Sequence, residues 1–361
     1  MSLDAMIDRI RDAAARGARL RIRGGGSKDF YGEPSVAGEE LSTLALSGIA
    51  SYEPSELVVT VRAGTALAEL EAVLARSGQC LPFEPPHFGG GATVGGMVAA
   101  GLSGPARASA GPVRDYVLGV TMVNGRGELL TFGGQVMKNV AGYDVSRLMV
   151  GALGTLGLIV EASLKVLPIA PAEATLKFEM SQGDALRRLN EWGGRPLPLN
   201  ASCWVEDGGR GVLYLRLRGA VAAVDAACRA LGGERQVNEA VAADWLACRD
   251  QQLPWFMERG ERDLWRISVP QVAPVLELPE APLVEWHGAQ RWVRAHAADA
   301  ARIRAAAARA GGHATLFRAN DSQATHRFTP LAAPLDRIHR DLKHEFDPAG
   351  LFNSGRLYPD F

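Results

Sequence analysis

The chain has few cysteines and no recognisable cysteine pattern. Four occur among its 361 residues, and none is separated from another by just two residues. Their positions, at Cys80, Cys203, Cys228 and Cys248, match neither a zinc site nor an iron–sulfur frame. Scattered thiols of this kind are typical of a protein in a reducing compartment. We therefore expect no metal site and a cytoplasmic location.

An excess of charge of one sign is also missing. Lys and Arg together number 39 and Asp and Glu 40, which gives a formal net charge of -1. Nothing in this balance favours nucleic acid as a partner. The longest uncharged stretch, 88–106, contains seven glycines and Pro105. We therefore expect a loop region there and no transmembrane segment.

Glycine, in contrast, is in excess. The chain has 41 glycines, a share above the usual value of about 7%. Two clusters stand out, at 24–27 after a predicted strand and at 89–96. Glycine lets a backbone approach a ligand closely, and successive N–H groups can bind phosphate oxygens. Each cluster on its own fits a plain turn at least as well.

Common phosphate and nucleophile motifs are absent from the sequence. No Lys follows a Gly, which excludes a Walker A loop, and no cluster supplies the three glycines of a Rossmann fingerprint. The segment 101–105 resembles a nucleophile elbow but has Pro105 in place of the last glycine. The glycine clusters therefore remain the main functional signal.

Apolar periodicity indicates strands and helices in both halves of the chain. In the first half we expect a helix to about residue 16, another from Leu67, and strands at 19–23, 57–62, 116–123, 128–132 and 158–167. After Pro171 we expect strands at 174–180, 201–206, 212–218, 264–269, 284–294 and 313–317, and helices at 183–192, 220–231 and 297–310. A short amphipathic helix follows Pro334. This order predicts an antiparallel α+β layer in the second half.

Taken in order, the glycine-containing segments resemble a known family. They are 23–27, 61–65, 91–96, 103–104, 114–119, 124–125, 138–144, 151–159 and 346–356. This series, which spans residues 20–170 and the C-terminal segment, is similar to the FAD-binding domain of the vanillyl-alcohol-oxidase/p-cresol-methylhydroxylase type. Within that type, it resembles the FAD-linked D-2-hydroxyacid oxidases.

The resemblance implies an α+β fold with a two-part FAD-binding domain at 1–170 and an antiparallel α+β cap at 171–333. The segment 334–361 is expected to pack back on the first domain. Some relatives attach FAD through a His in the first glycine loop, where this chain has Ser27 or Lys28, so FAD is expected to be non-covalent. The residues implied for FAD binding are Arg23, Gly24, Gly25, Gly26, Ser27, Lys28, Gly90, Gly91, Ala92, Thr93, Val94, Gly95, Gly96, Ser103, Gly104, Gly154, Thr155, Gly157 and Ile159.

The catalytic motif of the family is depleted in this chain. Oxidising a 2-hydroxy acid requires a hydride acceptor, a base for the hydroxyl proton and a cation for the carboxylate. Catalytic relatives carry G-H-x-G-D-G-N-x-H in the cap, and this chain retains Gly312 and His313 of it. Arg266 matches the place of a carboxylate-binding arginine. The catalytic candidates are therefore Arg266, His313 and Arg318, with a structural ion pair for Arg266 and a buried pair of His313 and Arg318 as alternatives.

An intact FAD half, a depleted cap motif and a short chain resemble the FAD-binding subunits of glycolate oxidases. The resemblance implies oxidation of glycolate, a small 2-hydroxyacid, to glyoxylate in a hetero-oligomer. Its expected partners are a larger FAD-containing catalytic subunit and an iron–sulfur subunit that takes the electrons. Peripheral association with the inner face of the membrane through this complex is a further expectation.

Two other functions stay open. The chain fits a non-catalytic FAD-binding scaffold or electron relay, and it fits a stand-alone FAD-dependent 2-hydroxyacid oxidase. We also expect an exposed partner surface on the cap that includes the aromatic segment 253–257. A lid over the flavin is the alternative role of that segment.

Overall fold

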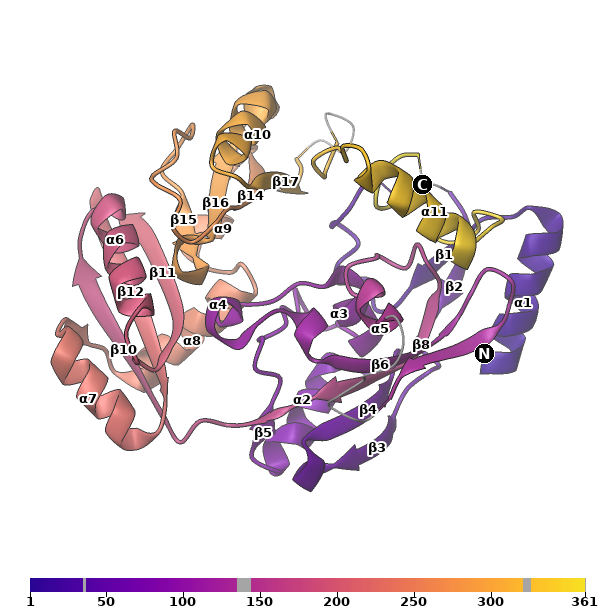
Figure 1. Cartoon of the computed structure of the whole chain (residues 1–361), viewed down its shortest axis with the longest axis horizontal. Helices are drawn as coiled ribbons and strands as arrows, with labels where there is room; N and C mark the ends of the chain where they lie inside the picture. The colour runs from indigo at the N-terminus through magenta and orange to yellow at the C-terminus, as the bar shows by residue number, and fades with distance from the viewer. Residues whose placement is uncertain (35–36, 135–143, 321–325, 361) are drawn as a thin grey trace.

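The N-terminal half of the molecule is built on an antiparallel sheet. The computed structural model describes residues 1–34, 37–134, 144–320 and 326–360. Five strands form this sheet in the order β3 (Ile49–Glu53), β4 (Val58–Arg62), β8 (Leu158–Lys165), β6 (Val117–Val123) and β7 (Leu129–Gly133). The predicted hairpin at 124–127 joins β6 to β7 (Figure 1).

Two helices bury apolar side chains against this sheet. Helix α2 (Leu67–Arg76) contributes Leu67, Leu70 and Leu74, the spacing that predicted it. Helix α3 (Val94–Ala100) lies inside the glycine-rich segment, where the sequence predicts a loop. The Oγ1 atom of Thr93 accepts a hydrogen bond from the N–H of Gly96 at 3.2 Å and so caps this helix.

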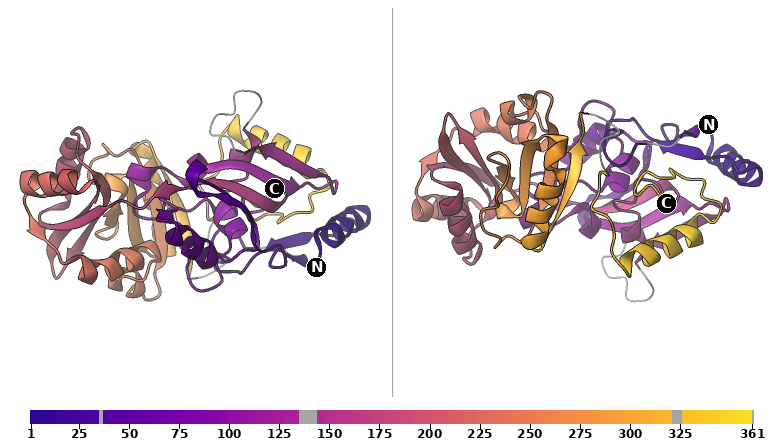
Figure 2. Two further views of the ribbon diagram at one scale, coloured as in Figure 1. Left: turned by 90° about the horizontal axis from the view of Figure 1, so that it is seen from below. Right: turned by 90° about the horizontal axis from the view of Figure 1, so that it is seen from above.

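A smaller layer carries the N-terminus. Helix α1 (Leu3–Arg16) packs against a parallel pair of strands, β1 (Leu20–Arg23) and β2 (Glu39–Ser42). Both chain ends lie on this half of the molecule, away from the second sheet (Figure 2). The remaining elements of the half are β5 (Gln79–Cys80), which pairs with β9 (Leu167–Pro168), α4 (Arg107–Ala110), α5 (Val145–Leu148) and 3-10 turns at Pro54–Glu56 and Val113–Asp115.

An eight-stranded sheet follows, and every strand pair in it is antiparallel. Its order is β13 (Glu234–Arg235), β10 (Ala172–Glu179), β12 (Arg210–Gly219), β11 (Leu199–Asp207), β15 (Leu283–Glu285), β16 (Gln290–Ala295), β14 (Asp263–Ser268) and β17 (His313–Arg318). The chain changes from one sheet to the other between Pro168 and Ala172. The predicted α+β class is confirmed.

Helices cover both faces of the second sheet. Helices α6 (Gln182–Gly193), α7 (Val221–Leu231) and α10 (Ala300–Arg309) pack on one face, and α8 (Asn238–Arg249) and α9 (Pro254–Met257) on the face toward the N-terminal half. The sequence pattern does not predict α8. Its apolar face is Val241, Trp245 and Cys248, with small alanines between them.

One predicted strand is interrupted. The segment 284–294 is not continuous, because a turn at Trp286–Gly288 separates β15 from β16. Trp286 and His287 have positive φ angles of 53° and 55°, which no continuous strand allows. A short 3-10 turn at Ala297–Asp299 likewise precedes α10, so the predicted helix at 297–310 begins later.

A buried ion pair joins the two halves. Glu84, between β5 and α3, accepts hydrogen bonds from Arg216 at 2.6 Å and from Arg218 at 3.0 Å, and both arginines lie on β12. Burial by itself would raise the pKa of Glu84, but the two arginines outweigh it and lower that pKa. The second sheet is therefore held to the first half by a charged contact with no exposed carboxylate.

The last helix, α11 (Leu335–Phe346), returns to the N-terminal half (Figure 1). Its Lys343 is buried and donates to the carbonyls of Thr155 at 2.7 Å and Phe352 at 2.9 Å, and to Asp347 at 2.5 Å. Asp347 is fully buried and also accepts from the N–H groups of Leu351 and Phe352. One lysine thus ties the C-terminal segment to the loop before β8.

Replacing this lysine should destabilise the fold strongly. Lys343→Met leaves the Asp347 carboxylate buried without its cation, which costs about 3–5 kcal/mol of unfolding free energy. Urea unfolding of the purified chain measures the change. As a control on the same helix, Arg337→Ala breaks an exposed ion pair with Asp341 and should change stability by about 0.5 kcal/mol or less. Equal effects of the two variants would contradict this role of Lys343.

Candidate functional site

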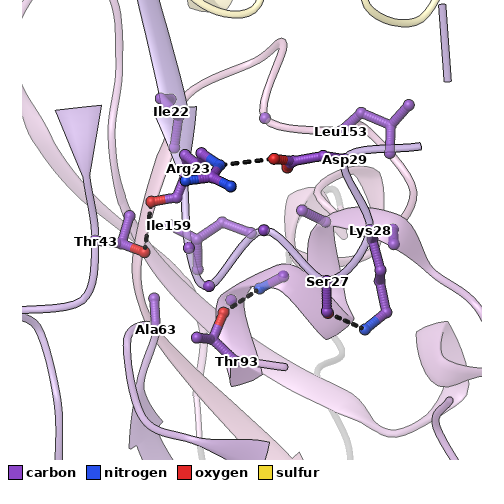
Figure 3. A pocket seen from close by; sticks show the side chains of 18 of the residues that line it. Ile22, Arg23, Ser27, Lys28, Asp29, Thr43, Ala63, Thr93, Leu153 and Ile159 are labelled. Carbon is purple, nitrogen blue, oxygen red and sulfur yellow. Dashed lines mark hydrogen bonds and ion pairs between the residues drawn. The ribbon is translucent and has the colours of Figure 1, made fainter. Parts of the chain in front are cut away.

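An open pocket lies where the glycine-rich loops of the N-terminal half meet (Figure 3). The loop after β1, the first turns of α3, the loop before β8 and the C-terminal segment form its walls. The structure brings together thirteen of the predicted residues here: Arg23, Gly24, Gly25, Gly26, Ser27, Lys28, Gly91, Thr93, Gly95, Gly96, Gly154, Gly157 and Ile159. The two glycine clusters therefore form a single site.

The two glycine loops touch backbone to backbone. A Cβ atom on Gly25 would lie 1.7 Å from the carbonyl oxygen of Gly91, and one on Gly91 would lie 2.6 Å from the carbonyl oxygen of Gly25. A Cβ atom on Gly24 would lie 2.5 Å from the Thr93 hydroxyl oxygen, and one on Gly95 would lie 2.9 Å from the carbonyl oxygen of Ala63. Glycine is required at these positions because the protein segments themselves approach so closely.

The first loop offers a row of backbone donors. In the described residues, no partner accepts from the N–H groups of Gly24, Gly25, Gly26, Ser27 and Lys28. Consecutive free N–H groups in a loop of this kind favour an anion, above all a phosphate oxygen. The loop lies beside Thr93 and α3, so the donors face a pocket with a second glycine wall.

Two cations flank these donors. Arg23 binds Asp29 through its Nε atom at 2.7 Å, so much of its charge is already neutralised (Figure 3). Lys28 has no such ion pair in the described residues, and its Nζ atom lies 3.3 Å from the Ser27 hydroxyl oxygen. Burial lowers the pKa of Lys28 to about 8. A neighbouring anion would restore the charge of this lysine.

The C-terminal segment supplies two wall residues that the site prediction missed. Asn353 accepts from the N–H of Ile22 at 2.7 Å and donates to the carbonyl of Leu153 at 2.7 Å. The Arg356 guanidinium donates to the carbonyls of Asp29 at 2.6 Å and Tyr31 at 2.5 Å. These residues form part of the motif at 346–356, which is the signal that could have revealed them.

Six of the predicted residues do not line this pocket, namely Gly90, Ala92, Val94, Thr155, Ser103 and Gly104. Gly90 is exposed and has no protein atom near the position of a Cβ. Ala92 and Val94 are buried in the hydrophobic core beneath the sheet, and the Thr155 hydroxyl donates to the carbonyl of Ala152 at 2.7 Å. Ala92, Val94 and Thr155 are therefore buried in the protein next to pocket-lining residues and do not face the pocket. Of the family segment 138–144, residues 138–143 lie outside the described residues.

Ser103 and Gly104 lie in a second, smaller recess between the two halves. Arg266, Glu285, Gln290 and Phe317 of the second sheet complete its walls, and its volume is about 20 Å³. This is room for a water molecule and too little for an organic acid. The Trp286 indole donates to the carbonyl of Gly104 at 2.9 Å and so joins this loop to the second sheet.

Glu285, which the sequence does not single out, is the buried acid of this recess. It accepts hydrogen bonds from Trp292 at 2.5 Å, Gln290 at 3.0 Å and the Cys248 thiol at 3.2 Å. Burial raises the pKa of its carboxyl group. Strand register explains the arrangement, because Cys203, Glu285 and Gln290 are paired neighbours on one face of the sheet.

Positive charge gathers beside this recess. Arg266 donates to the Tyr31 hydroxyl at 3.1 Å, and Arg107 stacks 4.3 Å from the centre of the Trp286 ring. Burial lowers the pKa of Arg107, and the charge of Arg266 lowers it further. Within the described part of the chain neither arginine forms an ion pair. The sequence-based candidate Arg266 thus has a partner, Arg107, that no motif indicated.

The expected buried pair of His313 and Arg318 is wrong. The two residues lie at opposite ends of β17, and His313 is exposed. Although His313 is exposed, neighbouring protein atoms displace part of its solvent; this desolvation, followed by the charges of Arg266 and Arg107, lowers the pKa of His313. Arg318 stacks 3.5 Å from the centre of the Phe30 ring and donates to Gln251 at 2.9 Å. His313 belongs with the cationic recess, whereas Arg318 packs among aromatic rings.

Comparison with known proteins identifies this architecture. A family model described as FAD binding domain matches residues 2–133. Glycolate oxidase subunit GlcE of Escherichia coli (strain K12) is 46% identical over 99% of this chain and 97% of its own length. The chain belongs to the GlcE family. The predicted cofactor, FAD, is thereby confirmed, and the chain is an FAD-dependent oxidoreductase.

Further relatives match about two fifths of the chain. Glycolate oxidase subunit GlcD of Bacillus subtilis is 32% identical over 40% of this chain and 30% of its own length. D-lactate dehydrogenase of Archaeoglobus fulgidus is 36% identical over 41% of this chain and 33% of its own length. A solved structure of alkyldihydroxyacetonephosphate synthase superposes with a TM-score of 0.65, at 14% identity, over 97% of this chain and 75% of that chain. The predicted fold family is therefore confirmed along the whole chain.

The pocket fits the phosphate part of FAD. Its free N–H groups, its glycine walls and the Lys28 ammonium group suit a diphosphate, which carries negative charge and several acceptor oxygens. No helix in the described residues is long and apolar enough to span a membrane. The same residues contain no cluster of three or more His, Cys, Asp or Glu side chains suited to a metal ion.

Blocking the pocket should remove the flavin. Gly96 lines the pocket, and a Cβ there would meet just the Thr93 hydroxyl, at 3.1 Å. We expect Gly96→Leu to fold and to bind little FAD, whereas Gly90→Leu, in the exposed part of the same segment, keeps it. Flavin released by acid from each purified variant measures this. Gly95→Trp is a poorer test, because its side chain would clash with Ala63.

Two outcomes would contradict the assignment of this pocket to FAD held without a covalent bond. Normal flavin content in Gly96→Leu would show that the cofactor lies elsewhere. Flavin that stays with the acid-precipitated protein would show a covalent bond, against the expectation from Ser27 and Lys28.

The affinity for FAD should fall at alkaline pH. Lys28 has a pKa of about 8 in the free protein, and a bound diphosphate raises it. Binding then takes up a proton above about pH 8, so the dissociation constant for FAD rises as pH increases through that value. Lys28→Met should remove this dependence, and Lys165→Met on β8 should retain it. Titration of the cofactor-free chain with FAD at several pH values is the measurement, and parallel profiles for all three proteins would contradict the role of Lys28.

Proposed function

We propose that this chain is the FAD-binding subunit of a multi-subunit glycolate oxidase. The observation that carries the proposal is the similarity to the E. coli glycolate oxidase subunit GlcE along nearly the whole of both chains. In this proposal glycolate is oxidised to glyoxylate, and the electrons leave through an iron–sulfur subunit. A larger FAD-containing catalytic subunit completes the complex, which works in the cytoplasm or at the inner face of the membrane.

In this proposal the two halves of the chain have different roles. Residues 1–170 and 334–361 bind FAD, with the loop at 24–28 holding the diphosphate, and residues 171–333 form the cap. FAD, when bound, supplies the hydride acceptor. The uncompensated charges of Arg266 and Arg107 support a binding site for the carboxylate of a 2-hydroxy acid, since a buried cation gains most from an anionic partner. His313 lies near enough for the charges of Arg266 and Arg107 to lower its pKa, which favours its neutral form.

A non-catalytic FAD scaffold or electron relay is the second candidate. The observation that favours it is the closed recess at Ser103 and Arg266, whose volume of about 20 Å³ admits no organic acid. Side chains around the recess would have to move before a substrate could bind. A partner subunit docked on the cap is one source of the energy for such a change.

We expect the isolated chain to oxidise glycolate poorly, because its recess is closed. The test is anaerobic bleaching of the flavin absorption band by glycolate, first with the purified chain and then with the assembled complex. Bleaching in the complex alone supports the subunit assignment. Fast turnover by the isolated chain with an artificial acceptor would favour a stand-alone oxidase.

In that stand-alone case the cationic recess becomes testable directly. Arg266→Ala should then raise KM, since one charge-assisted contact to a carboxylate contributes about 1.5–3 kcal/mol. This corresponds to roughly a 10- to 150-fold change in KM, with flavin content unchanged.

A further inference from the structure

The cap contains a cavity that the proposed function does not use. Its volume is about 490 Å³, and it lies between helices α8 and α9 and the face of the second sheet formed by β10, β11, β12 and β15. Helix α8 presents Val241, Asp244, Trp245 and Cys248 to it, which is one helical face. The glycine-lined pocket of the N-terminal half is separate and shares no residue with this cavity.

The interior of the cavity is aromatic and apolar. Trp245, Trp255 and Tyr214 form aromatic walls, and Val205, Leu253 and Leu283 fill the surface between them. Pockets that enclose small molecules have volumes of about 300–1,000 Å³ and are lined mainly by side chains of this kind. The size and lining therefore suit a flat organic molecule.

The rim of the cavity is acidic. Glu206, Asp207, Asp244 and Glu258 line it, and all four are exposed. None of these carboxylates forms an ion pair in the described ranges, although ion pairs are frequent on the rest of the surface. Burial raises the pKa of Tyr214 in the wall; the charge of Lys177 opposes this, and Asp207 and Asp244 of the rim add to the rise.

The one basic residue in the described lining carries less charge than the four acids of the rim. The Arg294 guanidinium stacks 4.7 Å from the centre of the Trp255 ring, lies 3.5 Å from Glu280 and donates to the carbonyl of Trp255 at 3.3 Å. Glu280 also pairs with Arg262, and Glu258 of the rim acts on Arg294 as well, so one cation faces several carboxylates. A 2-hydroxy acid, which is an anion, would be repelled at this entrance, so the cavity is not the route by which such a substrate enters.

We propose that the cap cavity is a second binding site, for a small aromatic molecule that carries a positive charge. The ring lies among Trp245, Trp255 and Tyr214, and the ammonium group remains at the rim beside Asp244 and Glu258. The proposal stands independently of glycolate oxidation, because it rests on the cavity and its charges alone. The competing occupant is an aromatic side chain of a partner polypeptide with lysine or arginine next to it in the sequence.

The arrangement also answers what the segment 253–257 does. Leu253, Pro254 and Trp255 form a wall of the cavity, Phe256 is buried against Trp292, and Met257 is 69% exposed. The segment therefore forms a wall of this cavity, and none of its residues lines the glycine-lined pocket. The expected lid over the flavin stays a prediction, and substitution of Phe256 would damage the core instead of testing an interface.

The experiment compares two probes of the same shape and opposite charge. Tryptamine is a cation and indole-3-acetate an anion, and calorimetry on the purified, FAD-loaded chain gives a dissociation constant for each. We expect tryptamine to bind about tenfold tighter or more. The double variant Asp244→Asn with Glu258→Gln should reduce this ratio toward one. Glu239→Gln, an exposed acid on α8 outside the cavity, should leave it unchanged.

A cavity-filling variant locates the binding. Val205→Trp should abolish binding of tryptamine while flavin content and melting temperature stay normal, and Leu253→Trp is the second choice if the first fails to fold. Unchanged tryptamine binding in the folded filled variant would overturn the proposal. Equal affinities of the wild-type chain for the two probes would also overturn it.

A separate binding experiment tests the polypeptide alternative. A blocked Lys-Trp-Lys tripeptide presents the same indole ring between two cations. If the peptide binds ten times tighter than tryptamine and Val205→Trp abolishes that binding, the cavity is a site for a protein partner. This result would overturn the small-molecule assignment. Peptide binding no tighter than that of tryptamine supports the proposal.

Discussion

The contact between Gly25 and Gly91 is the constraint on which the cofactor site depends. The backbones of two loops that are far apart in the sequence meet so closely that one methyl group on either residue would separate them. With the loops in contact, the N–H groups of 24–28 stay unpaired beside the second glycine wall. The glycine excess therefore reflects contact between protein segments first, and contact with a ligand second.

Much of the fold was predictable because its signals are local. Apolar periodicity located α1, α2, β6 and most strands of the second sheet to within a few residues. The sequence did not predict helix α3, because its glycine and alanine side chains give no amphipathic pattern. Its stability comes from burial and from the Thr93 cap. The interruption of the predicted strand at 286–288 was not predicted for a related reason. Two aromatic residues with positive φ angles do not change a hydrophobicity pattern.

The site was predictable to the extent that its chemistry is backbone chemistry. Glycine clusters indicate a loop whose backbone makes a close contact with a ligand or another segment, and thirteen of the predicted residues line one pocket. Side chains that act across long separations gave no such signal. Asn353 binds Ile22 across 331 positions, and Glu84 binds Arg216 across 132. The charge of Arg266 likewise reaches Arg107, and lowers its pKa, through the tertiary fold alone.

The second sheet presents two opposite electrostatic environments on one face. Toward β14 and β17 lie Arg266, Arg107 and His313, and toward β10 and β12 lies the cavity with its acidic rim. Cys248 belongs to the walls of both spaces, and its thiol donates to Glu285. An anion favoured at the first space is disfavoured at the second, so the two cannot exchange the same ligand. The wall that separates them is a hydrogen-bonded row, Cys248–Glu285–Gln290, with Trp292 on the same carboxylate. A ligand that moved Cys248 would therefore act on Glu285, which accepts a hydrogen bond from that thiol, and through it on the recess beside Arg266.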